Sequence, residues 1–567
     1  MAMRASGRAE DAIASVRVHL RLKPRDAEAL NLMGVLLQGA GRLDESERAL
    51  RRAVELDGRN PVWMNNLGIT LHYAGREGEA IACWERATSV APGYPLPWMA
   101  LASGYAKAGR SAEAIDAGRR AVELAPDAPA AHANLAFALQ QAGRTEEASA
   151  AADRAVEACP GEPRLRSSQL MLLNYLDGPA DRSVAAHRAF GAACPPIRPR
   201  AETAPGPARP LRIGFLSADL KDHSVAFFLE SILRGRDPSD RAIAFSAAPP
   251  RGGDPVQERL RGLFDEWVDA WTLDDAALDA AIRGHGVDVL VDLMGHSAGN
   301  RLPALASGPA PVIVTAIGYP NTTGLPSVGW RIVDSVTDPP GSEGWCTERL
   351  LRLDPCFLCY RPPDDAPEPT MPGPDGPITF GSFNNSAKVS ARTARLWAAA
   401  MAACPGARLL LKSMTLADPE VRRSIVRRLT EAGIAPDRVE LVGLTAGRAD
   451  HLALYGRVHV ALDTVPYNGT TTTCEALWMG VPTVTLSGDR HAARVSESIL
   501  RAAGHPEWIA PDESGFASIA ATLARDRPRL DSLRAGLRAE LRASVLLDAA
   551  AYAARFRECI RHAWRAR

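Results

Sequence analysis

The sequence of 567 residues has no excess of charge of either sign. Lys and Arg together number 66, and Asp and Glu together number the same. Because a protein that binds nucleic acid or an anionic membrane through its overall field carries a clear positive excess, we expect neither partner. Any anion that the protein binds must therefore be held by a local arrangement of residues.

Long apolar runs are also absent, and cysteines are few. No stretch reaches the roughly 18 uninterrupted apolar residues that a membrane helix needs, and the initial segment MAMRASGRAEDAI carries charges where a signal peptide has its apolar core. The nine cysteines include a single CxxC spacing, at Cys356 and Cys359, and no second pair that could complete a four-cysteine metal site, so we expect reduced thiols and neither a zinc site nor a disulfide framework. Together these absences predict a soluble, cytoplasmic protein.

An internal repeat of 34 residues occupies the first third of the chain. The tripeptide SGR at residue 6 and AGR at 40, 74, 108 and 142 place glycines at this interval, and a second series consists of Pro24, Gly58, Pro92, Pro126 and Pro160. We interpret the first series as the turn inside each helical pair and the second as the break between pairs. The pattern resembles the tetratricopeptide repeat. It predicts about four complete pairs to near residue 160, after a unit that opens at its turn, and further helices to about residue 195.

A solenoid of this kind presents a concave groove that suits an extended peptide or a partner protein. A rigid spacer or a dimerisation arm is the alternative interpretation of the same repeats. We take the repeats and their adjoining helices as one domain, residues 1–197, followed by a Pro/Ala-rich linker at 198–210.

After the linker, short apolar runs alternate with helical patterns, which indicates parallel sheets. The runs lie at 211–217, 287–295 and 311–318, and, after a Pro-rich loop, at 378–383, 407–413, 438–443, 457–463 and 481–488. We predict two doubly wound lobes, residues 211–373 and 374–567, with a cleft between them. Ligands of such sheets bind beyond the carboxyl ends of the strands.

Two loops that follow strands of the second half carry polar and basic residues. In NNSAKVS, Asn385 offers amide hydrogen bonds and Lys388 a positive charge, while Arg448 and His451 fall in the first turn of a short helix. Arg offers a fork for phosphate oxygens, and His offers a flat ring that can stack on a base. A solvated Lys, a surface Arg and a packed His are the alternatives.

Four consecutive threonines, Thr470 to Thr473, follow another strand and precede an apolar helix. The free N–H groups and the positive dipole end of a helix attract an anion, and the hydroxyls add further donors. Because one threonine is enough to cap a helix, we predict a phosphate-binding site here that works without a Walker lysine.

The first half contributes two further loops. SADLKDHSVAFFLE places Asp219 and His223 before a helix, and His223 is a candidate general base or acceptor contact, with a capping or packed histidine as the alternative. The loop GYPNTTG, 318–324, has glycines that indicate close backbone approach to a ligand near Tyr319 and Pro320. No Asp-x-Asp triplet of the kind that holds a metal–diphosphate complex follows any of these strands, so we expect no metal and no other cofactor.

The repeats together with four motifs resemble the protein O-linked N-acetylglucosamine transferases, in particular their bacterial members. The motifs are RIGFLSADLKDHSVAFFLE, GYPNTTGLPSVGWRIVDSVTDPP, FGSFNNSAKVS and DTVPYNGTTTTCEALWMGVPTVTLSGDRHAARVSESIL. The resemblance covers almost the whole chain. It implies a tetratricopeptide-repeat superhelix followed by an α/β GT-B glycosyltransferase of family 41 with two Rossmann-like lobes. Such enzymes transfer a sugar from a nucleotide diphosphate to Ser or Thr of proteins, with inversion and without a metal.

The resemblance also implies roles for individual residues. It places the lysine that neutralises the diphosphate at Lys388, beside Asn385, a second basic contact at Arg448, and the histidine that stacks on the base at His451. It places a proposed active-site base at His223.

In the threonine run, the resemblance assigns phosphate binding to Thr471 and Thr472 and leaves Thr473 as a cap. Two positions depart from the animal enzymes: Thr470 stands where they have a histidine, and Glu475 where they have an aspartate that contacts the ribose. These departures leave the choice of base and sugar open.

The function that follows is transfer of N-acetylglucosamine from UDP-N-acetylglucosamine (UDP-GlcNAc), held by the second lobe, to a protein hydroxyl presented by the repeat groove. One alternative keeps the chemistry but uses GDP-fucose, because GTTTTCE also resembles the plant SPINDLY branch, whose donor is GDP-fucose. Another is a repeat scaffold whose GT-B part is inactive. The general base stays open between His223, a donor phosphate oxygen and a water path to a carboxylate.

Overall fold

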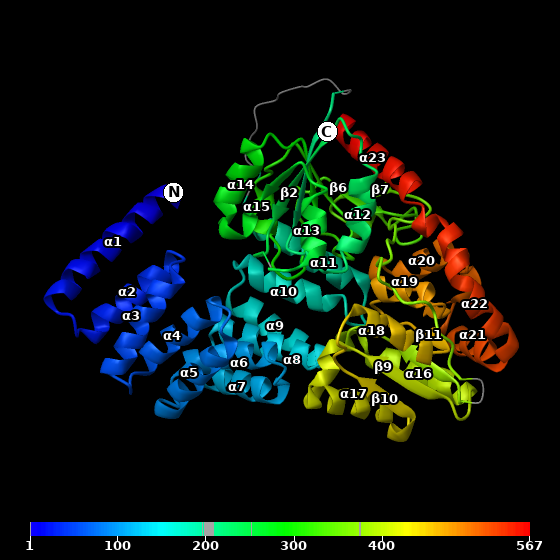
Figure 1. The fold of residues 1–567 in the computed structure, drawn as a ribbon, viewed down its shortest axis with the longest axis horizontal. Helices are drawn as coiled ribbons and strands as arrows, with labels where there is room; N and C mark the ends of the chain where they lie inside the picture. Colours follow the sequence, from blue (N-terminus) through cyan, green and yellow to red (C-terminus); the bar gives the residue numbers. More distant parts are fainter. Residues whose placement is uncertain (1, 196, 198–208, 251, 374–375) are drawn as a thin grey trace. The chain divides into compact units, whose positions relative to one another are not determined.

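The computed structural model describes residues 2–195, 197, 209–250, 252–373 and 376–567 (Figure 1). The chain forms two compact units, Met1–Pro160 with Asp418–Val421, and Gly161–Ala417 with Arg422–Arg567. The division after Pro160 falls inside the region 1–197 that the sequence led us to group as one domain. Of the predicted linker 198–210, only the last two residues lie within the described part.

The first unit consists of four helical pairs that repeat at the predicted interval, preceded by α1 (Ala2–Leu22). The pairs are α2 (Ala27–Gly39) with α3 (Leu43–Leu56), α4 (Pro61–Tyr73) with α5 (Glu77–Val90), α6 (Pro95–Lys107) with α7 (Ser111–Leu124), and α8 (Pro129–Gln141) with α9 (Thr145–Ala158). The turn inside each pair contains Gly41, Gly75, Gly109 or Gly143, all with φ between 70° and 77°. Only glycine adopts this conformation without strain, which confirms the meaning of the AGR series.

The structure differs from the prediction at Gly7, which lies within α1 instead of at a turn. Glycine is tolerated inside a helix at a modest cost relative to alanine, so this residue does not by itself require a turn.

The second unit opens with α10 (Pro163–Leu173) and α11 (Ala180–Ala193) and continues into a parallel seven-stranded sheet, in the order β3-β2-β1-β4-β5-β6-β7. Its strands are β1 (Arg212–Ser217), β2 (Arg241–Ser246), β3 (Glu266–Val268), β4 (Val289–Asp292), β5 (Val312–Thr315), β6 (Trp330–Val333) and β7 (Arg349–Arg352). Its helices are α12 (Ala226–Arg234), α13 (Pro255–Arg261), α14 (Asp275–Gly284) and α15 (Leu302–Ala306). Every residue of β4, β5 and β6 is buried, as expected of strands covered on both faces. We call this part, residues 209–373, the first lobe.

The second lobe, residues 376–543, is built on a parallel six-stranded sheet in the order β10-β9-β8-β11-β12-β13. Its strands are β8 (Thr379–Ser382), β9 (Arg408–Lys412), β10 (Val439–Val442), β11 (Val460–Leu462), β12 (Thr483–Leu486) and β13 (Ile509–Ala510). Its helices are α16 (Ala391–Ala403), α17 (Pro419–Glu431), α18 (Arg448–Ala453), α19 (Thr471–Trp478), α20 (Val495–Ala503), α21 (Glu513–Arg525) and α22 (Arg527–Ala543). The two predicted strand–helix alternations are thereby confirmed.

The last helix, α23 (Ala549–Arg565), returns to the first lobe and packs on α12 (Figure 1). The hydroxyl of Tyr552 in α23 donates to the carbonyl of Phe357 at 2.8 Å. The chain therefore passes from the first lobe to the second and back again.

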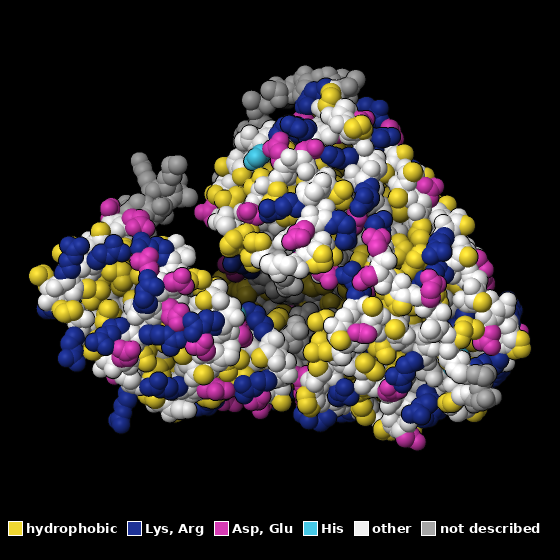
Figure 2. All heavy atoms as spheres, viewed as in Figure 1, with side chains coloured by type: hydrophobic (Ala, Val, Ile, Leu, Met, Phe, Trp, Pro, Cys, Tyr) yellow, Lys and Arg dark blue, Asp and Glu magenta, His cyan; other side chains and the backbone are white. Residues whose placement is uncertain are grey.

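Charged side chains of both signs are interspersed on the face of the molecule that Figure 2 shows, in keeping with the equal numbers in the sequence. None of the described helices combines the length and the apolar character that a membrane span requires.

Candidate functional site

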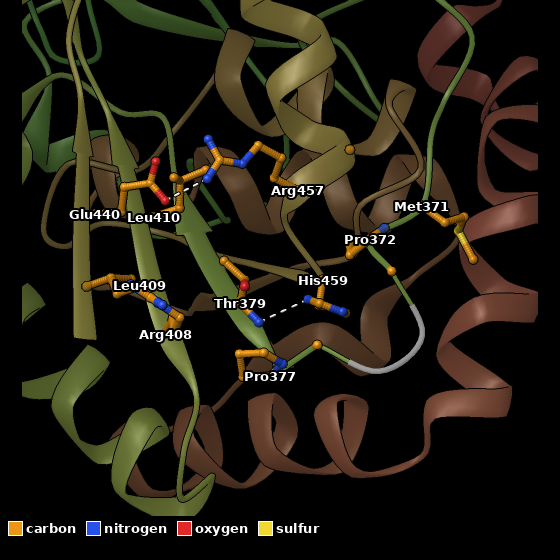
Figure 3. A pocket seen from close by; sticks show the side chains of 13 residues that line it. Met371, Pro372, Pro377, Thr379, Arg408, Leu409, Leu410, Glu440, Arg457 and His459 are labelled. Atoms are coloured by element: carbon orange, nitrogen blue, oxygen red, sulfur yellow. Dashed lines mark hydrogen bonds and ion pairs between the residues drawn. The ribbon is translucent and has the colours of Figure 1, made fainter. Parts of the chain in front are cut away.

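The predicted site residues of the second lobe gather at the carboxyl ends of its strands. The 3-10 helix Ser386–Lys388 follows β8, α18 follows β10, and α19 follows β11. A cavity of about 470 Å³ lies at the opposite edge of the sheet, where Thr379 begins β8 and Arg408 begins β9 (Figure 3). Because parallel sheets bind ligands beyond the carboxyl ends, we take the first edge as the site.

Lys388 is held without an acidic partner. Its Nζ donates to the carbonyl of Asn468 at 2.7 Å and lies 3.8 Å from the centre of the Tyr467 ring. No described carboxylate forms an ion pair with it. Burial lowers the pKa of Lys388 to about 8, against the charge of Asp463, so the ammonium form still predominates at pH 7. An anion bound beside Lys388 would neutralise an ammonium that has no ion-pair partner in the protein.

The threonine run divides into two free and two bonded hydroxyls. Thr472 Oγ1 donates to Asn384 Oδ1 at 3.0 Å, and Thr473 Oγ1 lies 2.9 Å from Ser496 Oγ. The hydroxyls of Thr470 and Thr471 have no partner among the described residues, and Thr470 precedes α19 without capping it. The helix N-terminus therefore offers two free donors beside its backbone N–H groups.

Asp463 shapes the turn that leads to these threonines. Its Oδ1 accepts the N–H groups of Gly469 at 2.7 Å and Thr464 at 2.8 Å, and its Oδ2 accepts the Thr485 hydroxyl at 2.7 Å. Burial raises the pKa of Asp463, and these donors oppose the rise. Asp463 is not among the residues predicted from the sequence, although a lone Asp directly after an apolar strand was a usable signal.

Asn385 and its neighbour Asn384 have different tasks. Asn385 is exposed, and its Oδ1 caps the 3-10 helix by accepting Ala387 N–H at 3.0 Å, which leaves its amide N–H groups available. Asn384 is buried and holds Thr472. The prediction that Asn385 contacts a ligand concerns its free amide group.

His451 and Glu475, predicted from separate motifs, lie side by side. His451 Nε2 is 3.1 Å from Glu475 Oε2, and its Nδ1 is buried without a partner in the described structure. The His451 ring also lies 5.7 Å from the Phe383 ring. An aromatic and polar niche of this type suits a base and its ribose.

Arg448 links the two lobes beside this niche. Its guanidinium donates to Asp222 of the first lobe and lies 4.8 Å from the centre of the Phe227 ring. Burial lowers the pKa of Arg448, with the charge of Glu475 acting in the opposite direction. Asp222 precedes His223, so this contact brings the loop that carries His223 to the second lobe.

The hydrogen bonds of His223 bear on its predicted role. Its Nδ1 accepts the Val225 N–H at 3.3 Å and lies 3.6 Å from Asp219 Oδ2. Burial lowers the pKa of His223, and the charge of Asp219 opposes this. When Nδ1 accepts a backbone N–H, the proton of the neutral ring sits on Nε2, an arrangement that favours donation over proton abstraction.

The loop 318–324 directs its side chains into the protein. The Tyr319 ring is buried, and its hydroxyl lies 2.8 Å from His187 Nε2 of α11, with Asn174 Nδ2 donating to it at 3.1 Å. Thr322 and Thr323 donate to Glu348. Pro320 is buried as well. Ligand contacts at Tyr319 and Pro320 therefore stay a prediction that concerns chiefly the backbone of this loop.

Lys412, which ends β9, is a further basic residue that the sequence motifs did not indicate. The residue is 8% exposed, and its side chain has no hydrogen bond or ion pair among the described residues. Burial lowers the pKa of Lys412, while the charge of Glu475 acts to raise it. A single lysine that closes the apolar run RLLLK was the available signal. In the described part of the chain, no three His, Cys, Asp or Glu side chains cluster as metal ligands.

Comparison with known proteins places these features in a family. A family model described as glycosyl transferase family 41 matches residues 198–359 and 370–556. The chain belongs to glycosyltransferase family 41. Tetratricopeptide-repeat models match residues 2–61, 31–95, 65–129 and 105–171. The family and the repeats that the sequence motifs predicted are thus confirmed.

A solved member with the same architecture is the O-GlcNAc transferase of Thermobaculum terrenum, in a lysine-to-methionine variant. It superimposes with a TM-score of 0.81 and 33% identity over 95% of this chain and 97% of that chain. The predicted GT-B arrangement of two Rossmann-like lobes after a repeat region is confirmed by this match.

Curated members of the family include two plant branches. The SPINDLY protein of Petunia hybrida, named a probable UDP-N-acetylglucosamine–peptide N-acetylglucosaminyltransferase, is 39% identical over 366 residues, 63% of this chain and 39% of its own length. The SEC protein of Arabidopsis thaliana, with the same activity in its name, is 25% identical over 350 residues, 60% of this chain and 35% of its own length. The chain spans less than half the length of these curated relatives.

Proposed function

We propose that this family 41 member is an inverting, metal-independent glycosyltransferase that moves N-acetylglucosamine from UDP-GlcNAc to Ser and Thr hydroxyls of proteins. The observation that carries the proposal is the position of Lys388, a cation without an ion-pair partner. It is hydrogen-bonded to Asn468, two residues before the free hydroxyls of Thr470 and Thr471 at the start of α19. A diphosphate would satisfy all of these groups at once.

The proposed chemistry concerns the leaving group. The acceptor oxygen forms a bond to the anomeric carbon as the bond from that carbon to the diphosphate breaks, so negative charge grows on the departing nucleoside diphosphate. Lys388 and the N-terminus of α19 are aimed at this charge, and donors that strengthen their hold as charge develops lower the barrier. Thr471 supplies a free hydroxyl, whereas the Thr472 hydroxyl donates to Asn384 and would have to turn away from it to reach a phosphate oxygen.

The same proposal assigns the nucleoside to the niche of His451 and Glu475. The imidazole stacks on the base, Glu475 accepts a ribose hydroxyl, and Arg448 adds a second positive charge. Glu475 already has a hydrogen-bonded neighbour in His451, which fixes the carboxylate for this task.

The absence of a metal from the proposal follows from the donor set. The groups that face the α19 N-terminus are a cation, hydroxyls and N–H groups, while the nearest carboxylate, Asp463, is bonded to Gly469, Thr464 and Thr485. Positive charge for the diphosphate therefore comes from Lys388 and Arg448. Activity that persists in a strong chelator is the expected outcome.

The base that takes the proton of the acceptor hydroxyl stays open among three candidates. His223 is the protein candidate, although its Nδ1 contact favours the tautomer that donates from Nε2. A donor phosphate oxygen and a water path to a carboxylate are the others.

We further propose that the repeat groove holds the acceptor protein and that the enzyme acts in the cytoplasm, a reducing compartment that suits its nine free cysteines.

The test is incubation of the purified protein with labelled UDP-GlcNAc and a protein lysate, followed by detection of labelled proteins. Wild-type protein should transfer the sugar, and Lys388→Met should lose roughly 100- to 1000-fold in rate with an unchanged fold. Transfer by Lys388→Met at the wild-type rate would refute the role of this lysine. Nucleotide binding without transfer to any protein would favour an inactive scaffold.

A second candidate function keeps the mechanism and changes the donor to GDP-fucose. The chain is 39% identical to SPINDLY of Petunia hybrida and 25% identical to SEC of Arabidopsis thaliana, and the GTTTTCE motif resembles the SPINDLY branch. Calorimetry with UDP and GDP separates the candidates. A clear preference for GDP, together with transfer of labelled fucose, would replace the first candidate by the second.

A further inference from the structure

The loop between β12 and α20 contains the 3-10 helix His491–Ala493. It is connected to Lys388 by two hydrogen bonds that both involve Asn468. The carbonyl of Ala492 accepts the backbone N–H of Asn468 at 2.9 Å. The carbonyl of Asn468 in turn accepts a hydrogen bond from Lys388 Nζ at 2.7 Å. The position of this loop therefore bears on the position of Lys388.

The same loop is anchored in the other lobe. His491 Nδ1 lies 2.5 Å from Oδ2 of Asp338, which follows β6 in the first lobe. Arg331 of β6 donates to the other oxygen of Asp338 at 3.3 Å. The rings of His491 and Phe357 meet edge to face, 5.0 Å apart. The first lobe thus holds the imidazole through a polar atom and through a ring contact.

The His491–Asp338 contact is buried and directional. The side chains of His491 and Asp338 are 7% and 5% exposed. Although burial acts to raise it, the neighbouring His491 and Arg331 hold the pKa of the Asp338 carboxyl well below its ordinary value, while burial and the charge of Arg331 lower the pKa of His491. A carboxylate at this distance requires a proton on Nδ1, whether the ring is neutral or charged. Away from water, such a bond fixes both partners more firmly than a surface pair does.

We propose that His491 and Asp338 are positioning residues that set the place of Lys388 from across the lobe boundary. The first lobe would then govern, through Ala492 and Asn468, the group that stabilises the leaving diphosphate. The inference rests on the proposed function of Lys388 as the diphosphate contact.

A second hydrogen bond across the same boundary provides a matched control. Ser498 of α20 donates to Asp334 Oδ2 at 2.5 Å, and both side chains are buried. This bond joins the lobes near His491 but does not lead to Asn468. If the lobes need only to be held together, Ser498→Ala and His491→Leu should have similar effects on the rate.

The first experiment compares kcat and the KM for the donor in these variants. His491→Leu should lower kcat by roughly 10- to 100-fold with a smaller change in KM, because a misplaced group costs most in the transition state. His491→Asn, whose amide N–H can reach the place of Nδ1–H, should recover most of the loss. Ser498→Ala should stay within about twofold of the wild type. Equal losses in His491→Leu and Ser498→Ala would overturn the proposal.

The second experiment asks whether the effect passes through the lysine. In a Lys388→Met background, His491→Leu should cause no further loss of kcat, because the group that it positions is already gone. If His491→Leu lowers kcat by its full factor in that background, the pair acts by another route and the proposal fails. Asp338→Asn keeps the shape of the side chain. It should likewise lower kcat in the wild-type background and cause no further loss in the Lys388→Met background.

The third experiment needs no donor and no activity. Each folded variant, checked by circular dichroism, is exposed to an amine-labelling reagent, and labelling at Lys388 is followed by peptide mass spectrometry. Release of the loop should speed labelling of Lys388 in His491→Leu and Asp338→Asn and leave Ser498→Ala like the wild type. Unchanged labelling in both variants would overturn the positioning role. Faster labelling in a protein that transfers no sugar would instead uphold the positioning role and refute the proposed function.

Discussion

The ammonium of Lys388 lies against a backbone carbonyl and a tyrosine ring, two neighbours that carry no full negative charge. Burial lowers its pKa to about 8, whereas a bound diphosphate would raise that value again. Binding of the nucleotide should therefore take up a proton above pH 8. At lower pH the lysine is already charged in the free protein, so no proton is needed.

We accordingly expect the Kd for UDP to be nearly flat between pH 7 and about pH 8 and to rise by up to about tenfold per pH unit above that. Isothermal titration calorimetry at several pH values, in buffers of different ionisation enthalpy, measures both the Kd and the proton uptake. In Lys388→Met the rise and the uptake should disappear. A wild-type Kd that stays constant to pH 9.5 would contradict the assignment.

The division of the threonine run gives a second prediction at this scale. Thr471 has a free hydroxyl at the start of α19, so Thr471→Val should weaken UDP binding by roughly tenfold or more, the effect of a lost hydrogen bond to a charged group. Thr473→Val is the matched control, because its hydroxyl bonds to buried Ser496. That variant should lose about 1 kcal/mol of stability and keep its affinity. Equal weakening of UDP binding in both variants would count against the division.

The sequence predicted the residues of this site better than it predicted their tasks. A run of hydroxyls before an apolar helix is visible locally, and so is a lysine after a buried strand. Which hydroxyls are free depends on Asn384 and Ser496, which lie 88 and 23 residues from their threonine partners. Lys412 was not predicted as a site residue, because only the folded structure shows that it is buried without a partner among the described residues.

At the scale of helices and loops, the sequence patterns predicted those elements that are determined by neighbouring residues in the chain. The 34-residue period identified the helical pairs because each turn repeats the same backbone requirement for glycine. The 34-residue period could not show that α10 and α11 pack with the first lobe instead of with the repeats. Leu170 and Phe190 pack in a core with residues of the first lobe, and His187 contacts Tyr319, 132 residues further along the chain.

The contact between α11 and the loop 318–324 leaves no room for a larger residue at Gly324. Its φ is 76°, and a Cβ there would lie 2.0 Å from the carbonyl oxygen of His187. Gly324→Ala should therefore destabilise the protein by about 1–3 kcal/mol, which is seen as a lower unfolding temperature in calorimetry. Gly329→Ala, at a position open to added atoms, should leave that temperature nearly unchanged. Similar temperatures for the two variants would show that the loop can move away from α11.

For the whole molecule, the division after Pro160 predicts where the chain can be cut. A fragment of residues 161–567 keeps α10 and α11 and should bind UDP with the affinity of the full chain, while losing transfer to protein acceptors. A fragment of residues 195–567 lacks both helices, so it exposes the core around Leu325 and leaves Tyr319 without its partners. It should unfold at a lower temperature or aggregate. Calorimetry of both fragments checks this, and equal stability would contradict the grouping of α10 and α11 with the lobes.

The return of α23 to the first lobe has a mechanical consequence. Two separate stretches of chain join the lobes, one between Arg361, which bonds to Phe227, and Pro367, which accepts from Arg538 of α22, and one between α22 and α23. Any opening that admits a donor and releases its product must move both connections at once. Rotation about the line that joins the two crossings disturbs them least, so the second crossing favours that rotation over other motions of the lobes.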